Sequence, residues 1–233
     1  MSRVPLVLLP GLLLNKRMWQ PQIEALWEIA DCWVPDLSQA DTMAEMAQQV
    51  LAEAPERFAL AGLSMGGLLS FELWRQAPEC ITQLALLDTN PRLDTPERQE
   101  DRRRQLRMVA SGRFPEITTD VLLPRLVHPD RLHDQALGQV ILDMGLSVGP
   151  TGFCNQINAV LSRSNSVSTL PTISVPTLVL CGREDILTPL ELHEEMAASI
   201  PNATLTVLEH CGHLSTLEQP EAVTRALCDW LVP

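Results

Sequence analysis

The sequence predicts an α/β protein in which helices cover both faces of a parallel β-sheet. Short apolar runs rich in Leu and Val alternate along the chain with longer amphipathic runs. The short runs lack the polar–apolar alternation of a half-exposed strand, so each is expected to be buried on both faces. Each is separated from the next by a predicted helix, as parallel pairing requires. The chain of 233 residues is long enough for one sizeable core with an insertion.

The first part of the chain contains four predicted strands, over residues 4–11, 32–37, 57–64 and 84–88, with helices over 19–27, 41–55 and 65–78 between them. The first strand ends in a Pro-Gly turn. The helix over 41–55 has clear boundaries, because Thr42 and Glu45 form a capping box and Pro55 follows its last turn. The third helix stops at Pro78.

This rhythm breaks after the fourth strand. Residues 90–163 are helical in pattern, with breaks at Ser111-Gly112, Pro129 and Gly149-Pro150. Strands then resume over 175–182 and 203–209, with a helix from residue 189 and a last helix over 219–231. A helical insertion between the fourth and fifth strands should lie over the carboxyl edge of the sheet, where ligands bind in open α/β folds.

Composition limits the choice of partners and compartment. The formal net charge of −12 disfavours nucleic acids and anionic membrane surfaces, which would repel the protein. No apolar run approaches the ~20 residues of a membrane span, and the N-terminal apolar stretch lacks the features of a signal peptide. The scattered cysteines suit a reducing cytoplasm, although their even number leaves disulfides open. They lie at positions 32, 80, 154, 181, 211 and 228.

The stretch Gly62-Leu63-Ser64-Met65-Gly66 matches the nucleophile-elbow pattern G-x-S-x-G. A helix N-cap serine in a glycine-rich turn would look the same within these five residues. The pentapeptide joins a predicted strand to a predicted helix, which is the context that the elbow requires. We therefore expect Ser64 to be a nucleophile.

A serine hydroxyl needs a base within hydrogen-bond reach and an acid that orients the base. Asp185 follows the predicted strand over 175–182, and His213 follows the predicted strand over 203–209. Both positions lie at the carboxyl edge of the sheet, above Ser64. The chain order Ser, Asp, His is that of the α/β-hydrolase fold.

At these residues the chain resembles the α/β-hydrolase superfamily over essentially its whole length. The resemblance rests on LLPGLLLNKRMW, LAGLSMGG, APECITQLALLDT, LPTISVPTLVLCGREDILTP and CGHLSTLEQPEAV. It implies Ser64 as nucleophile, Asp185 as acid and His213 as base. It also implies a minimal, mostly parallel sheet of about six strands, a core over 1–90 and 164–233, and a helical cap over 91–163.

By the same resemblance the backbone N–H groups of Leu12 and Met65 form the oxyanion hole. Many relatives carry His-Gly at the first loop, where this chain has Pro10-Gly11. A backbone donor survives that substitution, but the support of the loop must differ.

Other titratable residues compete for these roles. Asp88 is the runner-up acid, although the resemblance makes it a structural hydrogen-bond acceptor, and Glu184 is expected to be a solvated neighbour of Asp185. His210 is expected at the end of a strand and His193 on a helix face among glutamates. His128 and His133 fall in the insertion and are expected to be ordinary surface histidines.

The insertion also contains a basic cluster, Arg102, Arg103, Arg104 and Arg107. A positive face there would attract an acidic substrate. The simpler expectation is a solvated helix on which Glu97, Glu100 and Asp101 pair with the arginines.

The function expected from the residues and the resemblance is that of a serine hydrolase acting on a small carboxylic ester, lactone or thioester. Carbon–carbon bond hydrolases, lyases and cofactor-free perhydrolases use the same fold and stay open, as does a non-catalytic ligand-binding relative. Neither a His-Glu-x-x-His nor a G-x-G-x-x-G motif occurs, so we expect no metal and no cofactor.

Overall fold

The computed structural model describes residues 3–232. Its centre is one six-stranded sheet in the order β2-β1-β3-β4-β5-β6, and every neighbouring pair is parallel. The predicted α/β class and the parallel sheet of six strands are confirmed. The strands are β1 (Val4–Leu9), β2 (Ala30–Trp33), β3 (Phe58–Leu63), β4 (Ile81–Leu87), β5 (Thr177–Gly182) and β6 (Ala203–Leu208).

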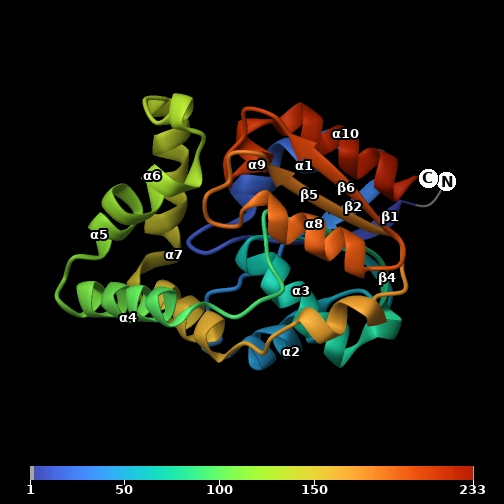
Figure 1. Cartoon of the computed structure of the whole chain (residues 1–233), viewed down its shortest axis with the longest axis horizontal. Helices are drawn as coiled ribbons and strands as arrows, with labels where there is room; N and C mark the ends of the chain where they lie inside the picture. Colours follow the sequence, from blue (N-terminus) through green and yellow to red (C-terminus); the bar gives the residue numbers. More distant parts are fainter. Residues whose placement is uncertain (1–2, 233) are drawn as a thin grey trace.

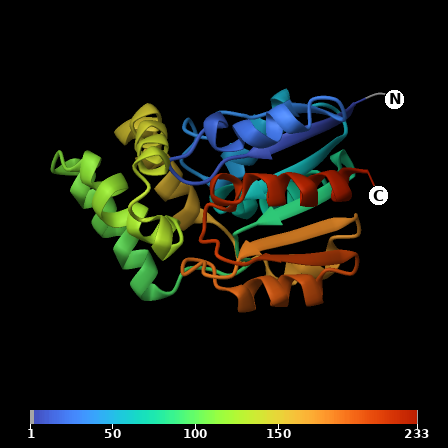
Figure 2. The ribbon, with the colours of Figure 1, turned by 90° about the horizontal axis from the view of Figure 1, so that it is seen from above.

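Helices cover both faces of the sheet (Figures 1 and 2). Alternate residues of β1 pack against opposite layers of helices. Leu6 and Leu8 lie in one core cluster together with residues of α1 (Gln20–Ala25) and α10 (Pro220–Leu231). Val7 and Leu9 pack in the other, against α2 (Met43–Glu53), α3 (Met65–Gln76) and α8 (Leu190–Ser199). The central strands β3 and β5 are buried along their whole length, which explains why their sequences show no polar alternation.

Element boundaries differ from the sequence prediction most clearly at the second strand. The predicted strand over 32–37 is displaced, because the strand in the structure is Ala30–Trp33 and ends before Pro35. Proline has no N–H to give to a ladder, so the chain leaves the sheet there.

Between β4 and β5 the chain forms a helical insertion (residues 91–163) that lies beside the sheet (Figure 2). It contains α4 (Pro96–Ala110), α5 (Phe114–Glu116), the π-helical turn η3 (Ile117–Leu122), α6 (Leu123–Leu126) and α7 (Gln135–Ser162). The predicted break at Gly149-Pro150 is a kink within α7, where Gly149 has a φ of 74°. The division of the chain into a core and a separate cap domain stays a prediction.

The remaining elements are short. They are the 3₁₀ turns η1 (Lys16–Trp19), η2 (Pro78–Cys80), η4 (Pro129–Arg131) and η5 (Val167–Thr172), and the helix α9 (Ser215–Glu218). All six cysteines are free thiols. Among the described residues, no helix has the length and apolar character needed to cross a membrane.

Candidate active site

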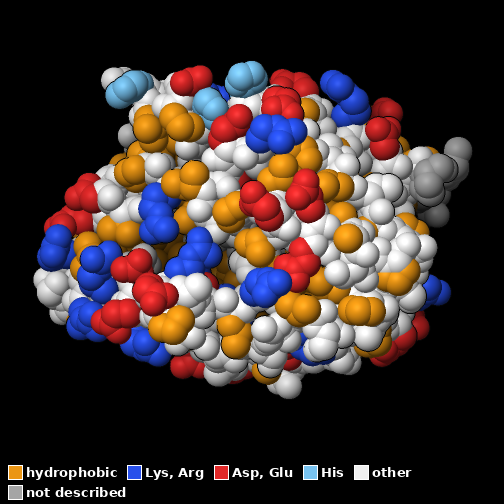
Figure 3. All heavy atoms as spheres, in the orientation of Figure 1, with side chains coloured by type: hydrophobic (Ala, Val, Ile, Leu, Met, Phe, Trp, Pro, Cys, Tyr) orange, Lys and Arg blue, Asp and Glu red, His pale blue; other side chains and the backbone are white. Residues whose placement is uncertain are grey.

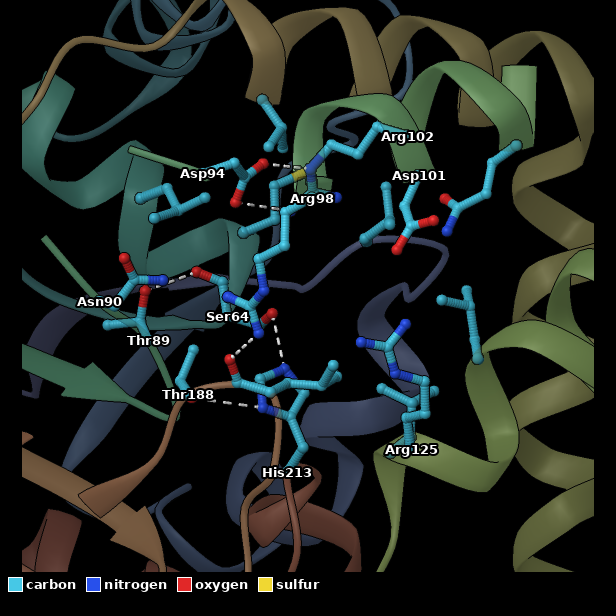
Figure 4. A pocket seen from close by; sticks show the side chains of 18 of the residues that line it. Ser64, Thr89, Asn90, Asp94, Arg98, Asp101, Arg102, Arg125, Thr188 and His213 are labelled. Carbon is cyan, nitrogen blue, oxygen red and sulfur yellow. Dashed lines mark hydrogen bonds and ion pairs between the residues drawn. The ribbon is translucent and has the colours of Figure 1, made fainter. Parts of the chain in front are cut away.

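Ser64 lies at the sharp turn between β3 and α3. Its backbone has φ 55° and ψ −113°, a conformation that residues with a side chain rarely adopt. The flanking glycines make the turn possible: a Cβ on Gly62 would lie 2.4 Å from the Gly66 carbonyl oxygen, and one on Gly66 would lie 2.3 Å from the Leu9 carbonyl oxygen. The turn holds the Ser64 hydroxyl at the carboxyl edge of the sheet, facing a pocket (Figure 4).

The structure brings the three residues predicted from the sequence into one hydrogen-bonded chain. The Nε2 atom of His213 lies 2.8 Å from Ser64 Oγ, and its Nδ1 lies 2.7 Å from Asp185 Oδ2. His213 and Asp185 are 2 % and 3 % exposed, so water does not compete for these contacts. Figure 4 shows the Ser64 and His213 side chains pointing toward one another.

Asp185 is held in place by its own loop. Its Oδ1 accepts hydrogen bonds from the N–H groups of Leu187 (2.8 Å) and Thr188 (3.0 Å), and its Oδ2 accepts one from the Thr188 hydroxyl (2.6 Å). Burial alone would raise the pKa of Asp185, but the charge of His213 and these hydrogen bonds lower it. Burial alone would lower the pKa of His213, and the Asp185 carboxylate raises it above its ordinary value.

The runner-up acid has other partners. Asp88 is fully buried after β4 and accepts hydrogen bonds from the Gly182 N–H (3.0 Å) and the Ser215 hydroxyl. Burial raises its pKa to about 8. Asp88 thus links β4, β5 and α9, whereas the histidine nitrogen that needs an acid faces Asp185.

Two expectations about neighbouring residues are wrong. His210 lies beyond β6, in an exposed turn with a φ of 54°, rather than on the strand. Glu184 is half-buried and accepts a hydrogen bond from the Cys211 N–H (3.0 Å), so it supports the loop that carries His213. The sequence places both residues near the site but does not show which contacts they make.

His193 lies on a helix beside glutamates as expected, but its side chain faces the core. It is fully buried on α8, and its Nε2 accepts a hydrogen bond from the Thr89 N–H (3.0 Å). The Thr89 hydroxyl in turn donates to the Ser64 carbonyl oxygen (2.8 Å). Burial lowers the pKa of His193 to about 4, so it stays neutral. His193 and Thr89 therefore support the turn of Ser64, and no sequence motif marks them.

The first loop carries the predicted donor Leu12. Leu12 and Met65 line the same pocket as Ser64, and within residues 3–232 neither N–H donates to a protein acceptor. The next N–H, that of Leu13, donates to the buried Gln156 Oε1 of α7 (2.9 Å). Gln156 thus anchors the loop that follows Pro10, a support that sequence reasoning missed because the two residues are 143 positions apart.

The pocket lies between the sheet edge and the insertion and has a cavity volume of about 110 Å³. The core contributes Ser64, Thr188 and His213, and the insertion contributes apolar Leu122 and Leu126 together with charged residues. Figure 3 shows basic and acidic side chains gathered over the insertion, where the surface is hollowed.

The arginines of the insertion divide into two groups. Arg104 pairs with Asp101 (3.0 Å), Arg107 pairs with Glu100 (2.6 Å), and these side chains are exposed, as expected for a solvated helix. Glu97, also expected to pair with an arginine, forms no ion pair within residues 3–232. Arg103 lies 3.9 Å from Glu100 on the same exposed face. Arg102 instead turns inward and pairs with the buried Asp94. Sequence reasoning missed three further arginines that line the pocket: Arg98, Arg125 and Arg163.

Within residues 3–232, the potential ligand atoms of His128, Glu184 and His210 lie within 4.8 Å of one another, close enough for a metal ion. His128 is buried, contrary to expectation, whereas His133 is exposed as expected. The Nδ1 of His128 accepts a hydrogen bond from the Asp130 N–H (3.1 Å). A neutral His128 must then carry its proton on Nε2, the atom that faces Glu184, and that atom has no lone pair for a metal.

The fold and the elbow define a class of α/β proteins with a serine at a strand–turn–helix junction. The sequence model of the alpha/beta hydrolase family matches residues 6–226. The chain therefore belongs to the alpha/beta hydrolase family.

Its relatives include hydrolases of several kinds and a candidate non-heme bromoperoxidase. The chain is 29 % identical to a candidate carbamate hydrolase, RutD, of Serratia proteamaculans over 97 % of its own length and 90 % of that protein. It is 28 % identical to the pimeloyl-[acyl-carrier protein] methyl ester esterase of Nitrosomonas europaea over 93 % of its length and 91 % of that esterase. A thermophilic esterase from Thermogutta terrifontis, solved with malate bound, superimposes with a TM-score of 0.88 at 31 % identity, covering 99 % of this chain and 90 % of that one. The family and these relatives support hydrolase activity.

Proposed function

We propose that the protein is a serine hydrolase that cleaves a small carboxylic ester, lactone or thioester through an acyl-enzyme. The observation that carries the proposal is the continuous chain from Ser64 Oγ through His213 to Asp185, with contacts of 2.8 and 2.7 Å. The esterases among the relatives support the same class of reaction.

In the proposed reaction, Ser64 Oγ attacks the substrate carbonyl carbon while His213 Nε2 accepts the hydroxyl proton. Asp185 holds the imidazole and stabilises the imidazolium that forms. The negative charge that develops on the carbonyl oxygen is stabilised by the N–H groups of Leu12 and Met65. Met65 is the first residue of α3, so the helix dipole adds to this stabilisation.

The tetrahedral intermediate collapses when the bond to the leaving group breaks, and the imidazolium returns its proton to the leaving oxygen or sulfur. The acyl group remains as an ester on Ser64. Water then attacks that ester, His213 again accepts a proton, and the acid is released with the Ser64 hydroxyl restored.

Initial rates on p-nitrophenyl esters from acetate to decanoate test the proposal. The native protein and the control Ser111→Ala, an exposed serine at the end of α4, should hydrolyse short esters, and Ser64→Ala should fall to the background rate. The length optimum then measures the acyl site. If no ester is hydrolysed although a fluorophosphonate labels Ser64, simple esterase activity is wrong, and lyase, lactone or carbon–carbon bond chemistry takes its place. If Ser64 is not labelled either, the proposed nucleophile is wrong.

A further inference from the structure

The pocket has a charge opposite to that of the whole protein. Its lining contains four arginines and two aspartates, Arg98, Arg102, Arg125, Arg163, Asp94 and Asp101. The lining therefore carries a formal charge of +2, whereas the chain carries −12. An acidic protein that gathers cations around one cavity creates a local field that favours an anion there.

The two aspartates are already engaged. Asp94 is shared by Arg102 and Arg163, and its contact with Arg163 Nη2 is 3.0 Å. Asp101 pairs with Arg104, which lies outside the pocket lining. No carboxylate of the lining therefore remains for Arg98 or Arg125.

Arg98 has a neutral partner. Its Nη2 donates to the Leu187 carbonyl oxygen (2.6 Å), in the loop whose N–H groups hold Asp185. Burial lowers the pKa of Arg98, and the charges of Arg102 and Arg125 act in the same direction, whereas Asp94 and Asp185 oppose it. Figure 4 shows its side chain reaching from α4 toward Ser64 and His213.

Arg125 has neither an ion pair nor a hydrogen bond within residues 3–232, and no interaction is drawn from it in Figure 4. The backbone beside Arg125 is nevertheless held against the site. The carbonyl oxygen of the next residue, Leu126, accepts hydrogen bonds from the N–H groups of His213 and Leu214, both at 3.0 Å. The backbone of Arg125 is thus one residue away from a direct contact with the loop that carries the proposed base, and its side chain lines the pocket.

We propose that Arg98 and Arg125 bind a carboxylate of the substrate, so that the protein acts on esters, lactones or thioesters that carry a second, free carboxylate. This inference rests on the proposed function of Ser64. A planar guanidinium with several N–H donors matches a carboxylate better than an ammonium does. The carbonyl to be attacked then lies over Ser64 while the free carboxylate lies between the two arginines.

The competing interpretation is structural. Arg98 also ties α4 to the Asp185 loop through Leu187, so its loss would affect neutral and anionic substrates alike. Arg125 has no such contact and is the sharper probe. The matched control is Arg107→Gln, on the exposed side of α4 with a side chain 63 % exposed.

The test compares the monomethyl esters of succinate, glutarate and adipate with neutral methyl esters in which an isopropyl group replaces the free carboxyl. In the native protein, kcat/KM should be at least tenfold higher for the half-ester of the best chain length than for its neutral counterpart. Arg125→Gln should lower kcat/KM for that half-ester at least tenfold more than it lowers kcat/KM for the neutral ester. Arg125→Lys should retain part of the preference, and Arg107→Gln all of it.

The outcomes separate this inference from the proposed function. If the native protein hydrolyses neutral and anionic esters equally, or Arg125→Gln lowers both rates alike, the carboxylate site is wrong and the hydrolase stands. If no ester is hydrolysed and Ser64→Ala changes nothing, the proposed function itself fails. If the Arg125 variants do not fold, an inhibition measurement on the native protein tests the same site. Glutarate should inhibit p-nitrophenyl acetate hydrolysis competitively and glutaramide should not. Equal inhibition by both would overturn the carboxylate site.

Discussion

Replacement of Asp94 should strongly destabilise the helical insertion. Its side chain is 3 % exposed and faces two guanidiniums, of which that of Arg163 is 5 % exposed and that of Arg102 is 22 % exposed. Arg163 also donates to the carbonyl oxygens of Val160 (2.7 Å) and Arg92 (3.1 Å), so it cannot turn to solvent without losing further hydrogen bonds. In Asp94→Asn both guanidiniums stay buried without a counter-charge.

The expected loss follows from the charges. Burial alone would raise the pKa of Asp94, but hydrogen bonds and charge from Arg102 and Arg163 lower it to about 2. Against an ordinary value near 3.8, a pKa of about 2 corresponds to about 2 kcal/mol of stability. Leaving two buried cations unpaired adds to this, so we expect Asp94→Asn to lower the free energy of unfolding by about 3 kcal/mol at pH 7.

Urea unfolding at pH 7 measures this loss, with Asp101→Asn as the matched control. Asp101 is 45 % exposed and pairs with an arginine that is 63 % exposed, so its replacement should cost less than about 1 kcal/mol. The Asp94 contribution is present above pH 3.8 and is lost as the pH falls through about 2. The difference in the free energy of unfolding between the native protein and Asp94→Asn should thus be smaller by about 1 kcal/mol at pH 3 than at pH 7. Equal losses in the two variants at pH 7, or a difference that widens in acid, would refute this reasoning.

Three further predictions concern the site and the turn that carries it. If His213 is the base, as proposed, the acid limb of the kcat/KM profile should have its midpoint above pH 6.5, because Asp185 raises the pKa of His213 and only the neutral imidazole accepts a proton. A midpoint below pH 6.5 would contradict this. Gly66→Ala should lower the free energy of unfolding by about 2 kcal/mol or more, because the new Cβ meets the Leu9 carbonyl, whereas Gly138→Ala, where the nearest atom to a new Cβ lies at 3.7 Å, should raise it by up to about 1 kcal/mol. Thermal unfolding measures both, and similar changes in the two variants would speak against the steric argument. The native protein should lose stability between pH 5 and pH 9, because burial raises the pKa of Asp88 to about 8, and this loss should be smaller in Asp88→Asn. Urea unfolding at both pH values measures the two losses, and equal losses would count against this prediction.

The sequence predicts the sheet well because each strand carries its own signal. A strand buried on both faces, such as β3 or β5, is a short apolar run wherever it lies in the sheet. The positions of Ser64, Asp185 and His213 follow from the same reasoning, because residues that directly follow parallel strands meet at one edge. Their proximity could thus be predicted without knowing any side-chain contact.

The contacts that complete the site depend on packing between distant segments, which periodicity does not report. Leu13 is supported by Gln156, and Thr89 by His193 at a separation of 104 positions. The basic cluster visible in the sequence is mostly on the exposed face of α4, while the less conspicuous Arg98 and Arg125 line the pocket. Which face of α4 turns inward is decided by how the insertion docks on the core, and the pattern of charges alone does not encode that docking.

The Leu126 carbonyl oxygen accepts hydrogen bonds from the N–H groups of His213 and Leu214, so the insertion helps to position His213 as well as covering the pocket. His213 is held by two contacts: its ring contacts Asp185, in the loop after β5, and its backbone N–H contacts Leu126, in a segment that a designer would regard as exchangeable. A chimera that replaces residues 91–163 with the corresponding block of a relative would therefore inherit a new pocket and, with it, an altered position for the histidine. Graft design in this scaffold should keep residues 125–128 with the core and vary the remaining helices.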